Sequence, residues 1–385
     1  MLNYGFNEEQ IMIRDLARQV AEEKIKPKSK EWDEKEEYPW EAMKALAQSD
    51  FFRLPIPEAY GGMGKGVLEM CIATEEVSRI DGGVATAFAA SFLGMFPILL
   101  YGTEEQKKKY LPLIASGEKI GAFAITEPEA GSDTASIKTR AEKRGDKYVL
   151  NGLKHFITNA GDAEVYTVIA VTDKTKGMRG TSGFILEKND PGFTFGKKEA
   201  KMGIRASSTG ELVFQDCAIP KDRLLGGREG IGFIATMRTF DVSRPGVASQ
   251  AVGIAQGALE LAIAYAHQRV QFGQKISSFQ GIQWMLADMA TKVEAARALV
   301  YSSAQSVDRG DRDVGGASAM AKLFASDVAM EVATNAVQIF GGYGYMRDYP
   351  VEKFMRDAKI TQIYEGTNQI QRGIIALELI KKYTR

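Results

Sequence analysis

Stretches of mixed apolar and charged residues fill the first 120 positions, and glycine, proline and polar residues separate them. This alternation of segments and breakers predicts helices at 8–21, 39–47, 68–80 and 104–114. A further segment, 82–103, carries no charged side chain and is long enough to span a bilayer. It contains four glycines and Pro97, and acidic residues flank it, so we expect a buried helix and no membrane span.

The hydrophobic pattern changes after about residue 120. Short runs rich in Val, Ile, Phe, Tyr and Thr predict strands at 148–150, 155–158, 166–172, 183–187 and 211–214. Asn151-Gly152 stands between the first two strands and is typical of a tight hairpin turn. From residue 230 onward, apolar residues recur at three- and four-residue spacing and predict helices at 230–269, 280–309, 315–340 and 367–382.

This order of helices, strands and helices divides the chain into a helical domain at 1–120, a β domain at 121–229 and a helical domain at 230–385. A chain of 385 residues is long enough for about two or three domains. Because strands and helices do not alternate, a doubly wound dinucleotide-binding sheet is excluded. The fold class is therefore α+β, multidomain and mainly α.

The composition of the chain excludes several classes of function. Forty-nine Lys and Arg balance forty-nine Asp and Glu, so the chain lacks the basic excess that nucleic acid binding requires. Cys71 and Cys217 form no metal-binding pair, and His155 and His267 are the only histidines, so we expect neither a metal site nor a serine-type triad. The N-terminus has no basic or apolar signal region, which, with so few cysteines, favours a cytoplasmic protein.

Three segments carry more chemistry than packing explains. Residues 124–133 (AITEPEAGSD) crowd hydroxyls, proline and glycine where the β region begins, and such a loop can present N–H and O–H groups to a ligand. Residues 338–345 (QIFGGYGY) end a long helix in a glycine cluster. Residues 364–369 (YEGTNQ) place the carboxylate of Glu365 in a short loop between helices, where a lone Glu is most often a helix-end charge.

Together, in this order and at these distances, the three segments make the whole chain resemble the acyl-CoA dehydrogenase family. Further similarity lies at 54–62 (LPIPEAYGG), 201–220, 240–244 and 269–273 (RVQFG). The resemblance implies an N-terminal helical domain, a middle β-barrel-like domain and a C-terminal four-helix bundle, assembled as a homotetramer. It also implies FAD as cofactor, an acyl-CoA thioester as substrate and electron-transferring flavoprotein as electron acceptor.

The resemblance implies roles for individual residues as well. Glu365 matches the catalytic base. For the flavin ring and its approach, the matching residues are Phe123, Ile125, Thr126, Ser132, Phe156 and Thr158. For the rest of FAD, they are Arg269, Phe272 and Gln280, with Thr367 and Gln369 closing the site and Gln338, Gly341 and Gly342 reaching it from a neighbouring subunit. For the CoA thioester, they are Ser132, Asp241, Arg244 and Gly366.

The implied reaction is the α,β-dehydrogenation of an acyl-CoA to the 2-enoyl-CoA in fatty acid β-oxidation. A base removes the α-proton, and burial in an apolar pocket raises the pKa of a Glu toward the working range. Hydride from the β-carbon passes to flavin N5. In the family, the backbone N–H of the residue matched by Glu365 and a flavin ribityl hydroxyl stabilise the charge on the thioester oxygen.

Departures from the family pattern bear on the acyl group. Ser243 stands where members acting on isovaleryl or long chains carry their base, which leaves Glu365 as the base candidate. The segment 82–103 lacks the arginine that pairs with a glutaryl carboxylate. Large residues of this segment would shorten the acyl pocket, namely Phe88, Phe92, Met95 and Phe96. Its small residues would leave the pocket wide, namely Ala87, Ala89 and Ala90.

A short straight, branched or cyclic acyl group suits either pocket shape. A cyclic (alicyclic) acyl-CoA dehydrogenase of anaerobic degradation is therefore the near alternative. An acyl-CoA oxidase, whose chains are generally much longer, is a more distant one. A non-enzymatic helical scaffold would require Glu365, the Gly-Ser-Asp loop and the glycine cluster all to be accidental.

Overall fold

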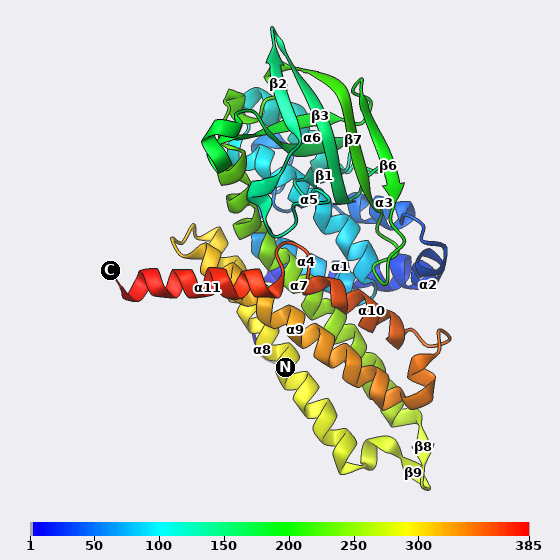
Figure 1. The fold of residues 1–385 in the computed structure, drawn as a ribbon. Helices are drawn as coiled ribbons and strands as arrows, with labels where there is room; N and C mark the ends of the chain where they lie inside the picture. Colours follow the sequence, from blue (N-terminus) through cyan, green and yellow to red (C-terminus); the bar gives the residue numbers. More distant parts are fainter. Residues whose placement is uncertain (1–2, 385) are drawn as a thin grey trace.

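Along the chain, a curled β-sheet is formed between an N-terminal and a C-terminal set of helices (Figure 1). The structure is a computed structural model that describes residues 3–384. The sheet lies at one end of the molecule, the first helices lie beside it, and the long C-terminal helices extend away from both. The expected α+β architecture, with helical N- and C-terminal parts and a central β part, is confirmed.

The N-terminal part consists of α-helices joined by short turns. They are α1 (Glu8–Val20), α2 (Lys26–Lys35), α3 (Trp40–Gln48), α4 (Val67–Ser78), α5 (Gly82–Tyr101) and α6 (Glu104–Ala115). Asn7 begins α1 with a capping box, in which its side chain accepts from Gln10 N at 2.8 Å. A π-helical turn at Ala21–Ile25 carries α1 into α2, so the helical rod continues beyond its predicted end at residue 21.

The uncharged segment forms α5, which packs against both the sheet and α7 (Gly232–Gln268). Asp81 caps its first turn by accepting from two backbone N–H groups. Gly94 lets α5 cross the first strand closely, because a Cβ here would lie 2.5 Å from the backbone nitrogen of Ala122. Both α5 and α7 are long and apolar enough to cross a membrane, but most of their residues are buried inside the fold, as in core helices.

The central part is one curled, mixed sheet. Its strands are β1 (Gly121–Ala124), β2 (Arg140–Arg144), β3 (Lys147–Thr158), β4 (Val165–Val171), β5 (Thr181–Glu187), β6 (Phe193–Lys198) and β7 (Thr209–Pro220). The strand order is β1-β4-β2-β3-β7-β6, and β5 pairs with β4. β1 and β2 run parallel to β4, but no α-helix connects these parallel neighbours, so the exclusion of a doubly wound sheet holds.

The hairpin turn predicted at Asn151-Gly152 is wrong. Both residues lie inside β3, which continues along β7. The pairing register shifts beside Gly152, and the Asn151 side chain bonds to Asp216 of β7, at 3.1 Å through its nitrogen and 2.9 Å through its oxygen. Pairing with the long partner strand outweighs the local turn preference and turns Asn-Gly into an irregularity within the strand. The connection between β2 and β3 instead contains Gly145, with φ 64°.

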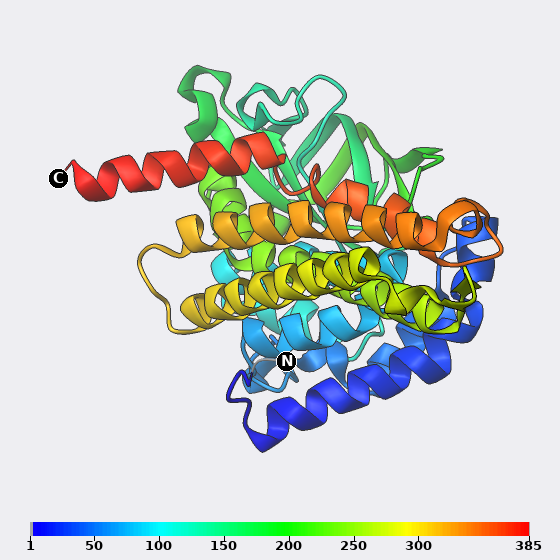
Figure 2. The same ribbon diagram turned by 90° about the horizontal axis from the view of Figure 1, so that it is seen from below.

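Long helices form the C-terminal part (Figure 2). After α7 they are α8 (Gln280–Asp308), α9 (Val314–Phe340), α10 (Val351–Thr361) and α11 (Asn368–Tyr383), and the short strands β8 (Val270–Gln271) and β9 (Gln274–Lys275) join α7 to α8. The helices expected in both helical parts are confirmed to within two residues at each end. The sequence analysis anticipated neither α2 nor α10.

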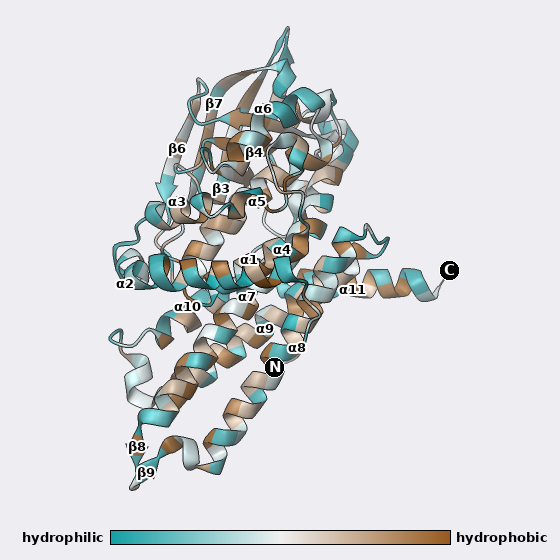
Figure 3. Cartoon of the chain, turned by 180° about the vertical axis from the view of Figure 1, so that it is seen from behind, coloured by the Kyte–Doolittle hydropathy of each residue, from teal (hydrophilic) through white to brown (hydrophobic). Residues whose placement is uncertain are grey.

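Some C-terminal helices expose apolar side chains. α11 projects from the rest of the chain (Figures 1 and 2), and its Leu377 and Ile380 are 64% and 58% exposed. Trp284 on α8 is 62% exposed. Hydrophobic residues along both helices are visible in Figure 3. Faces of this kind are suited to contact with another protein chain.

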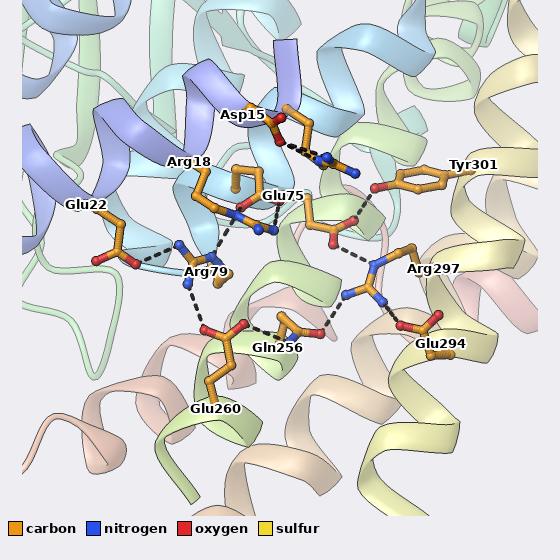
Figure 4. Close-up of polar contacts among 12 residues, drawn as sticks. Asp15, Arg18, Glu22, Glu75, Arg79, Gln256, Glu260, Glu294, Arg297 and Tyr301 are labelled. Carbon is orange, nitrogen blue, oxygen red and sulfur yellow. Dashed lines mark hydrogen bonds and ion pairs between the residues drawn. The ribbon is translucent and has the colours of Figure 1, made fainter. Parts of the chain in front are cut away.

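A network of charged side chains joins the N-terminal helices to the C-terminal bundle (Figure 4). Arg79, just after α4, lies 2.7 Å from Glu260 of α7. Arg297 of α8 lies 2.7 Å from Glu75 of α4, and Tyr301 donates to the same carboxylate at 2.8 Å. Both side chains are buried; Arg297 also pairs with Glu294, whereas the Glu75 carboxylate depends on Arg297 for a cationic partner.

Candidate active site

Glu365 lies in the loop between α10 and α11, where Ser243 of α7 donates a 2.6 Å hydrogen bond to its Oε2. Glu365 has φ 51° and Gly366 has φ 94°, so two consecutive residues take left-handed conformations. A left-handed Glu is uncommon and persists only where surrounding contacts hold it.

The two carbonyl groups of the loop accept from three neighbouring side chains. Gln371 Nε2 donates to the carbonyls of Glu365 and Gly366 at 3.1 and 3.0 Å. Lys322 Nζ of α9 donates to the Gly366 carbonyl at 2.8 Å, and Arg244 Nε lies 3.5 Å from the Glu365 carbonyl. Within residues 3–384 no group accepts from the backbone N–H of Glu365, which leaves this donor free for a ligand.

The environment of the Glu365 carboxylate shifts its acidity. Burial raises the pKa of Glu365 above its usual range, while the hydrogen bond from Ser243 and the positive charges of Arg244 and Lys322 oppose this rise. A partly buried carboxylate with a raised pKa is suited to accept a proton from carbon. The loop therefore has the chemistry of a general base.

One face of α7 supplies the polar residues beside Glu365. Arg244 is 4% exposed, its Nη1 lies 3.5 Å from Asp241 Oδ1, and its guanidinium lies 5.6 Å from the centre of the Phe240 ring. Burial raises the pKa of Asp241, which Arg244 partly offsets. The structure thus brings together four residues that the sequence analysis assigned to substrate chemistry: Asp241, Arg244, Glu365 and Gly366.

Phe240 links α7 to an apolar wall formed by the sheet. Its ring lies 5.8 Å from the ring of Phe123 on β1. Phe123 belongs to a buried cluster with Ile125, Ala130, Ile137 and Ile169, against which Leu93 of α5 packs. Because Phe240 and Ser243 are three residues apart on α7, the apolar wall and the Glu365 carboxylate meet in one part of the molecule.

The end of β3 lies next to this wall. His155 N donates to the carbonyl of Thr126 at 2.8 Å and so joins β3 to the loop after β1. The register of β3 on β7 shifts here, and Phe156 takes φ 57° with 59% of its side chain exposed. Thr158, the last residue of β3, is partly buried. An exposed aromatic ring beside an apolar wall is suited to pack against a flat ligand ring.

A buried ion pair holds the loop that follows β1. Lys154 Nζ donates to the Ile125 carbonyl at 2.9 Å and to Glu127 Oε1 at 2.7 Å. Glu127 also accepts from the backbone N–H groups of Lys138 and Thr139, at 2.6 and 2.9 Å. Burial lowers the pKa of Lys154 to about 8, with Glu127 opposing. The sequence analysis missed Lys154, although its place in a buried strand was a signal that its charge needs a partner.

Other predicted cofactor residues gather beyond the C-terminal end of α7. Arg269, Gly341 and Gly342 line one cavity of about 520 Å³. Arg269 has no carboxylate partner in the described part of the chain, and its guanidinium lies 5.4 Å from the Tyr343 ring. Phe272 is 93% exposed, and Gln280 and Gln338 are exposed as well. The sequence analysis assigned Arg269 and the glycines to different subunits, whereas within one protomer they line the same cavity.

One further cluster has the composition of a metal site. Ligand atoms of His155, Glu199 and Glu211 lie within 4.8 Å of one another. Lys197 Nζ lies 2.8 Å from Glu199 Oε2, and His155 Nδ1 lies 3.1 Å from Glu211 Oε1. The carboxylates therefore already have partners within the chain and require no cation.

Family models for the N-terminal, middle and C-terminal domains of acyl-CoA dehydrogenase match residues 7–118, 122–217 and 230–380. The chain belongs to the acyl-CoA dehydrogenase family. The short-chain specific acyl-CoA dehydrogenase of Clostridium acetobutylicum is 47% identical over 381 residues, covering 99% of this chain and 100% of the relative. This acyl-CoA dehydrogenase family member is therefore an oxidoreductase.

Solved structures share its fold. Butyryl-CoA dehydrogenase of Megasphaera elsdenii superposes with a TM-score of 0.96 at 47% identity, covering 98% of this chain and 100% of that one. A chain in a structure of the electron transferring flavoprotein of Acidaminococcus fermentans superposes with a TM-score of 0.97 at 51% identity, covering 99% and 100%. The acyl-CoA dehydrogenase fold inferred from the motifs is thus confirmed.

Acyl-CoA dehydrogenases are FAD-dependent flavoproteins, and the residues of this chain fit that cofactor. The apolar wall and exposed Phe156 suit the flavin ring, and the unpaired guanidinium of Arg269, at its open cavity, suits a pyrophosphate. Thr367 caps α11 by accepting from Ile370 N at 3.4 Å. Ser132 and Gln369 are exposed, on the loop after β1 and on α11.

Proposed function

We propose that the enzyme oxidises a short-chain acyl-CoA to the 2-enoyl-CoA, with Glu365 as the base that removes the α-proton. The observation that carries this proposal is the Glu365 carboxylate, held by Ser243 and with a pKa that burial raises. A short-chain specific enzyme and a butyryl-CoA dehydrogenase among the similar proteins support a short straight acyl group. No described residue specifically favours a cyclic acyl group or an oxidase.

Contacts along α5 bear on the acyl pocket. Phe88 and Phe92 are buried in the main core, with ring centres 5.0 and 6.0 Å from that of Phe52. Leu93 packs instead against the apolar wall that includes Phe123. We therefore assign Leu93, rather than the two phenylalanines, to the wall of the acyl pocket.

Each polar group of the site has a part in this reaction. Arg244 and Asp241 orient the thioester next to Glu365. As the α-proton leaves, negative charge develops on the thioester oxygen, and the free backbone N–H of Glu365 is a donor already in place for it. When FAD is bound, its flavin supplies the acceptor for the hydride from the β-carbon.

We assign each FAD to two protomers. Arg244, beside the base, and Arg269, at the second cavity, are separated by most of α7, which is roughly 40 Å of helix at 1.5 Å per residue. That separation exceeds an extended FAD, and β8 and β9 lie at the end of the molecule opposite the sheet (Figure 1). A second copy of the chain, placed with its Arg269 cavity against the first protomer's sheet, completes the site. The exposed apolar faces of α8 and α11 suit the homotetramer that we propose.

For the electron acceptor we propose an electron-transferring flavoprotein, supported by the chain in the Acidaminococcus fermentans structure. We place the enzyme in the cytoplasm, as its low cysteine content favours.

A panel of thioesters tests the substrate. Under anaerobic conditions, butyryl-CoA should reduce the flavin of the purified enzyme faster than longer, branched or alicyclic acyl-CoA thioesters. Turnover with an artificial electron acceptor should far exceed oxygen consumption. Fastest reduction by an alicyclic thioester, or oxygen as the preferred acceptor, would contradict the proposal.

A further inference from the structure

Lys322 is a fully buried lysine whose ammonium reaches the loop that carries Glu365. It stands on α9, and its Nζ donates to the carbonyl of Gly366 at 2.8 Å and to Asn368 Oδ1 at 2.9 Å. Asn368 is itself buried, and its Nδ2 donates to Asp327 Oδ1 at 2.7 Å. One ammonium group thus bonds to both ends of the turn between Glu365 and α11.

Burying the ammonium group of Lys322 costs free energy, so a role that offsets this cost is expected. An apolar side chain of similar length would fill the space without a desolvation penalty. The other charged groups that face Lys322 come from three segments: Arg244 on α7, Asp327 on α9 and Glu365 in the loop. Burial lowers the pKa of Lys322 to about 7, while Glu365 and Asp327 oppose this and Arg244 adds to it. The Asp327 carboxylate also pairs with Arg372 of α11, whose Nη2 lies 3.1 Å from Asp327 Oδ2.

The geometry links this contact to the base. Glu365 and Gly366 both have positive φ, and their carbonyls are held by Gln371, Arg244 and Lys322. Fixing these carbonyls fixes the Glu365–Gly366 and Gly366–Thr367 peptide planes, and this restrains the backbone of Glu365 and the direction of its carboxylate. Lys322 also places a positive charge near that carboxylate and favours its ionised form.

We propose that Lys322 is a positioning residue for the catalytic base: its ammonium holds the Glu365–Gly366 turn and favours the ionised carboxylate. This inference rests on the proposed function of Glu365. Two effects are separable, because the hydrogen bonds set the geometry of the turn and the charge sets the acidity of Glu365. Lys322 touches neither reacting atom and acts through Glu365.

Lys322→Met and Lys322→Gln separate these effects. Both variants should fold, because each acceptor keeps another donor: Gln371 at 3.0 Å from the Gly366 carbonyl, and Ser326 at 3.2 Å from Asn368 Oδ1. The matched control is Lys292→Met, which removes an exposed lysine of α8 paired with Glu331. FAD content, thermal midpoint and the rate of flavin reduction by butyryl-CoA from pH 5.5 to 9 are measured for all holoenzymes.

Lys322→Met should keep its FAD but slow flavin reduction by about 10-fold to 100-fold, the cost of a displaced catalytic group. The acidic limb of its pH profile should move to higher pH, because loss of the nearby cation raises the pKa of Glu365. Lys322→Gln should recover much of the maximal rate, since it restores a donor, while its acidic limb stays displaced. Lys292→Met should behave as wild type.

Hydrogen–deuterium exchange gives a readout that needs no turnover. Amides of residues 362–369 should exchange faster in Lys322→Met holoenzyme and at the wild-type rate in Lys292→Met. The inference is overturned if Lys322→Met keeps the wild-type acidic limb, maximal rate and loop exchange. It is also overturned if the rate of flavin reduction falls only in proportion to the FAD content. If Lys322→Met fails to fold, an undisplaced limb in Lys322→Gln overturns it. If no thioester reduces the flavin of the wild-type enzyme, the proposed function is refuted instead. The exchange rates of the loop amides would then still test whether Lys322 holds the loop.

Discussion

The Oγ of Ser243 donates to the Oε2 of Glu365 across 2.6 Å, and this contact ties the proposed base to α7. This hydrogen bond opposes the effect of burial on the pKa of Glu365, and the charges of Arg244 and Lys322 act in the same direction. The sequence analysis matches Ser243 to the position where members acting on isovaleryl or long chains carry their base, so here that position on α7 holds the proposed base and does not provide it.

Ser243→Ala should move the acidic limb of the rate profile to higher pH. The hydrogen bond from Ser243 favours the ionised carboxylate, so its loss raises the pKa of Glu365 and a higher pH is needed to ionise the base. The maximal rate above the limb should stay near wild type. The measurement is flavin reduction by butyryl-CoA against pH, with Ser249→Ala as control, since Ser249 lies buried on the same helix and bonds to the Gly246 carbonyl. An unmoved limb would contradict the assignment.

Mixing two inactive variants tests the shared FAD site. Arg269→Ala removes the guanidinium from one half-site, and Glu365→Gln removes the base from the other. If each FAD lies between protomers, oligomers formed from both chains contain sites with an intact base and an intact Arg269. Activity should return at about a quarter of the wild-type sites for random pairing. Mixed oligomers as inactive as each variant alone would show that both residues serve the same FAD within one chain.

Arg297→Met should destabilise the fold by about 3–5 kcal/mol, the cost of leaving a buried carboxylate without its partner. Glu75 is buried and keeps only the hydrogen bond from Tyr301 in this variant (Figure 4). Chemical denaturation measures the loss, and adding Glu75→Gln should recover part of it. The control is Arg14→Met. Arg14 pairs with the exposed Asp15, so its loss should change the free energy of unfolding very little. Equal effects of the two single substitutions would count against a structural role for this network.

Gly94→Ala should lower both stability and FAD content. The added Cβ would lie 2.5 Å from the nitrogen and 2.8 Å from the carbonyl carbon of Ala122, so α5 and β1 must separate at a cost of about 1–3 kcal/mol. Ala122 stands just before the residues that we assign to the flavin ring, so the displacement should reach them. Gly316→Ala is the control, because its Cβ would meet Glu378 at an ordinary 3.6 Å. Full FAD content and an unchanged midpoint in Gly94→Ala would contradict this packing.

The pattern of apolar residues predicted the long helices because their stability depends on a local repeat. The expected ends of 315–340 lie within one residue of α9, for example. The hairpin at Asn151-Gly152 failed because its turn preference is local, while pairing of β3 with β7 depends on residues more than sixty positions away. Distant pairing decides such cases, and a single sequence does not display it.

The motifs identified Glu365 and the loop after β1, but not the residues that hold them. Lys322 stands among alanines in a helical segment, and its contact with Gly366 arises only when α9 packs beneath the last loop. Arg269 and Gly341 follow two different helices, and their common cavity exists because α8 returns between α7 and α9 and brings both helix ends together. Contacts of this kind follow from helix packing, which the spacing of residues along one helix does not specify.

The most direct test of the account is the rate at which butyryl-CoA reduces the flavin of Glu365→Gln. The amide keeps the shape of the loop but cannot accept the α-proton, so reduction should slow by about 10²-fold to 10⁴-fold. FAD content should stay at the wild-type level, and butyryl-CoA should still perturb the flavin spectrum on binding, because other residues hold both ligands. Reduction of Glu365→Gln at close to the wild-type rate would contradict the assignment of Glu365 as the base.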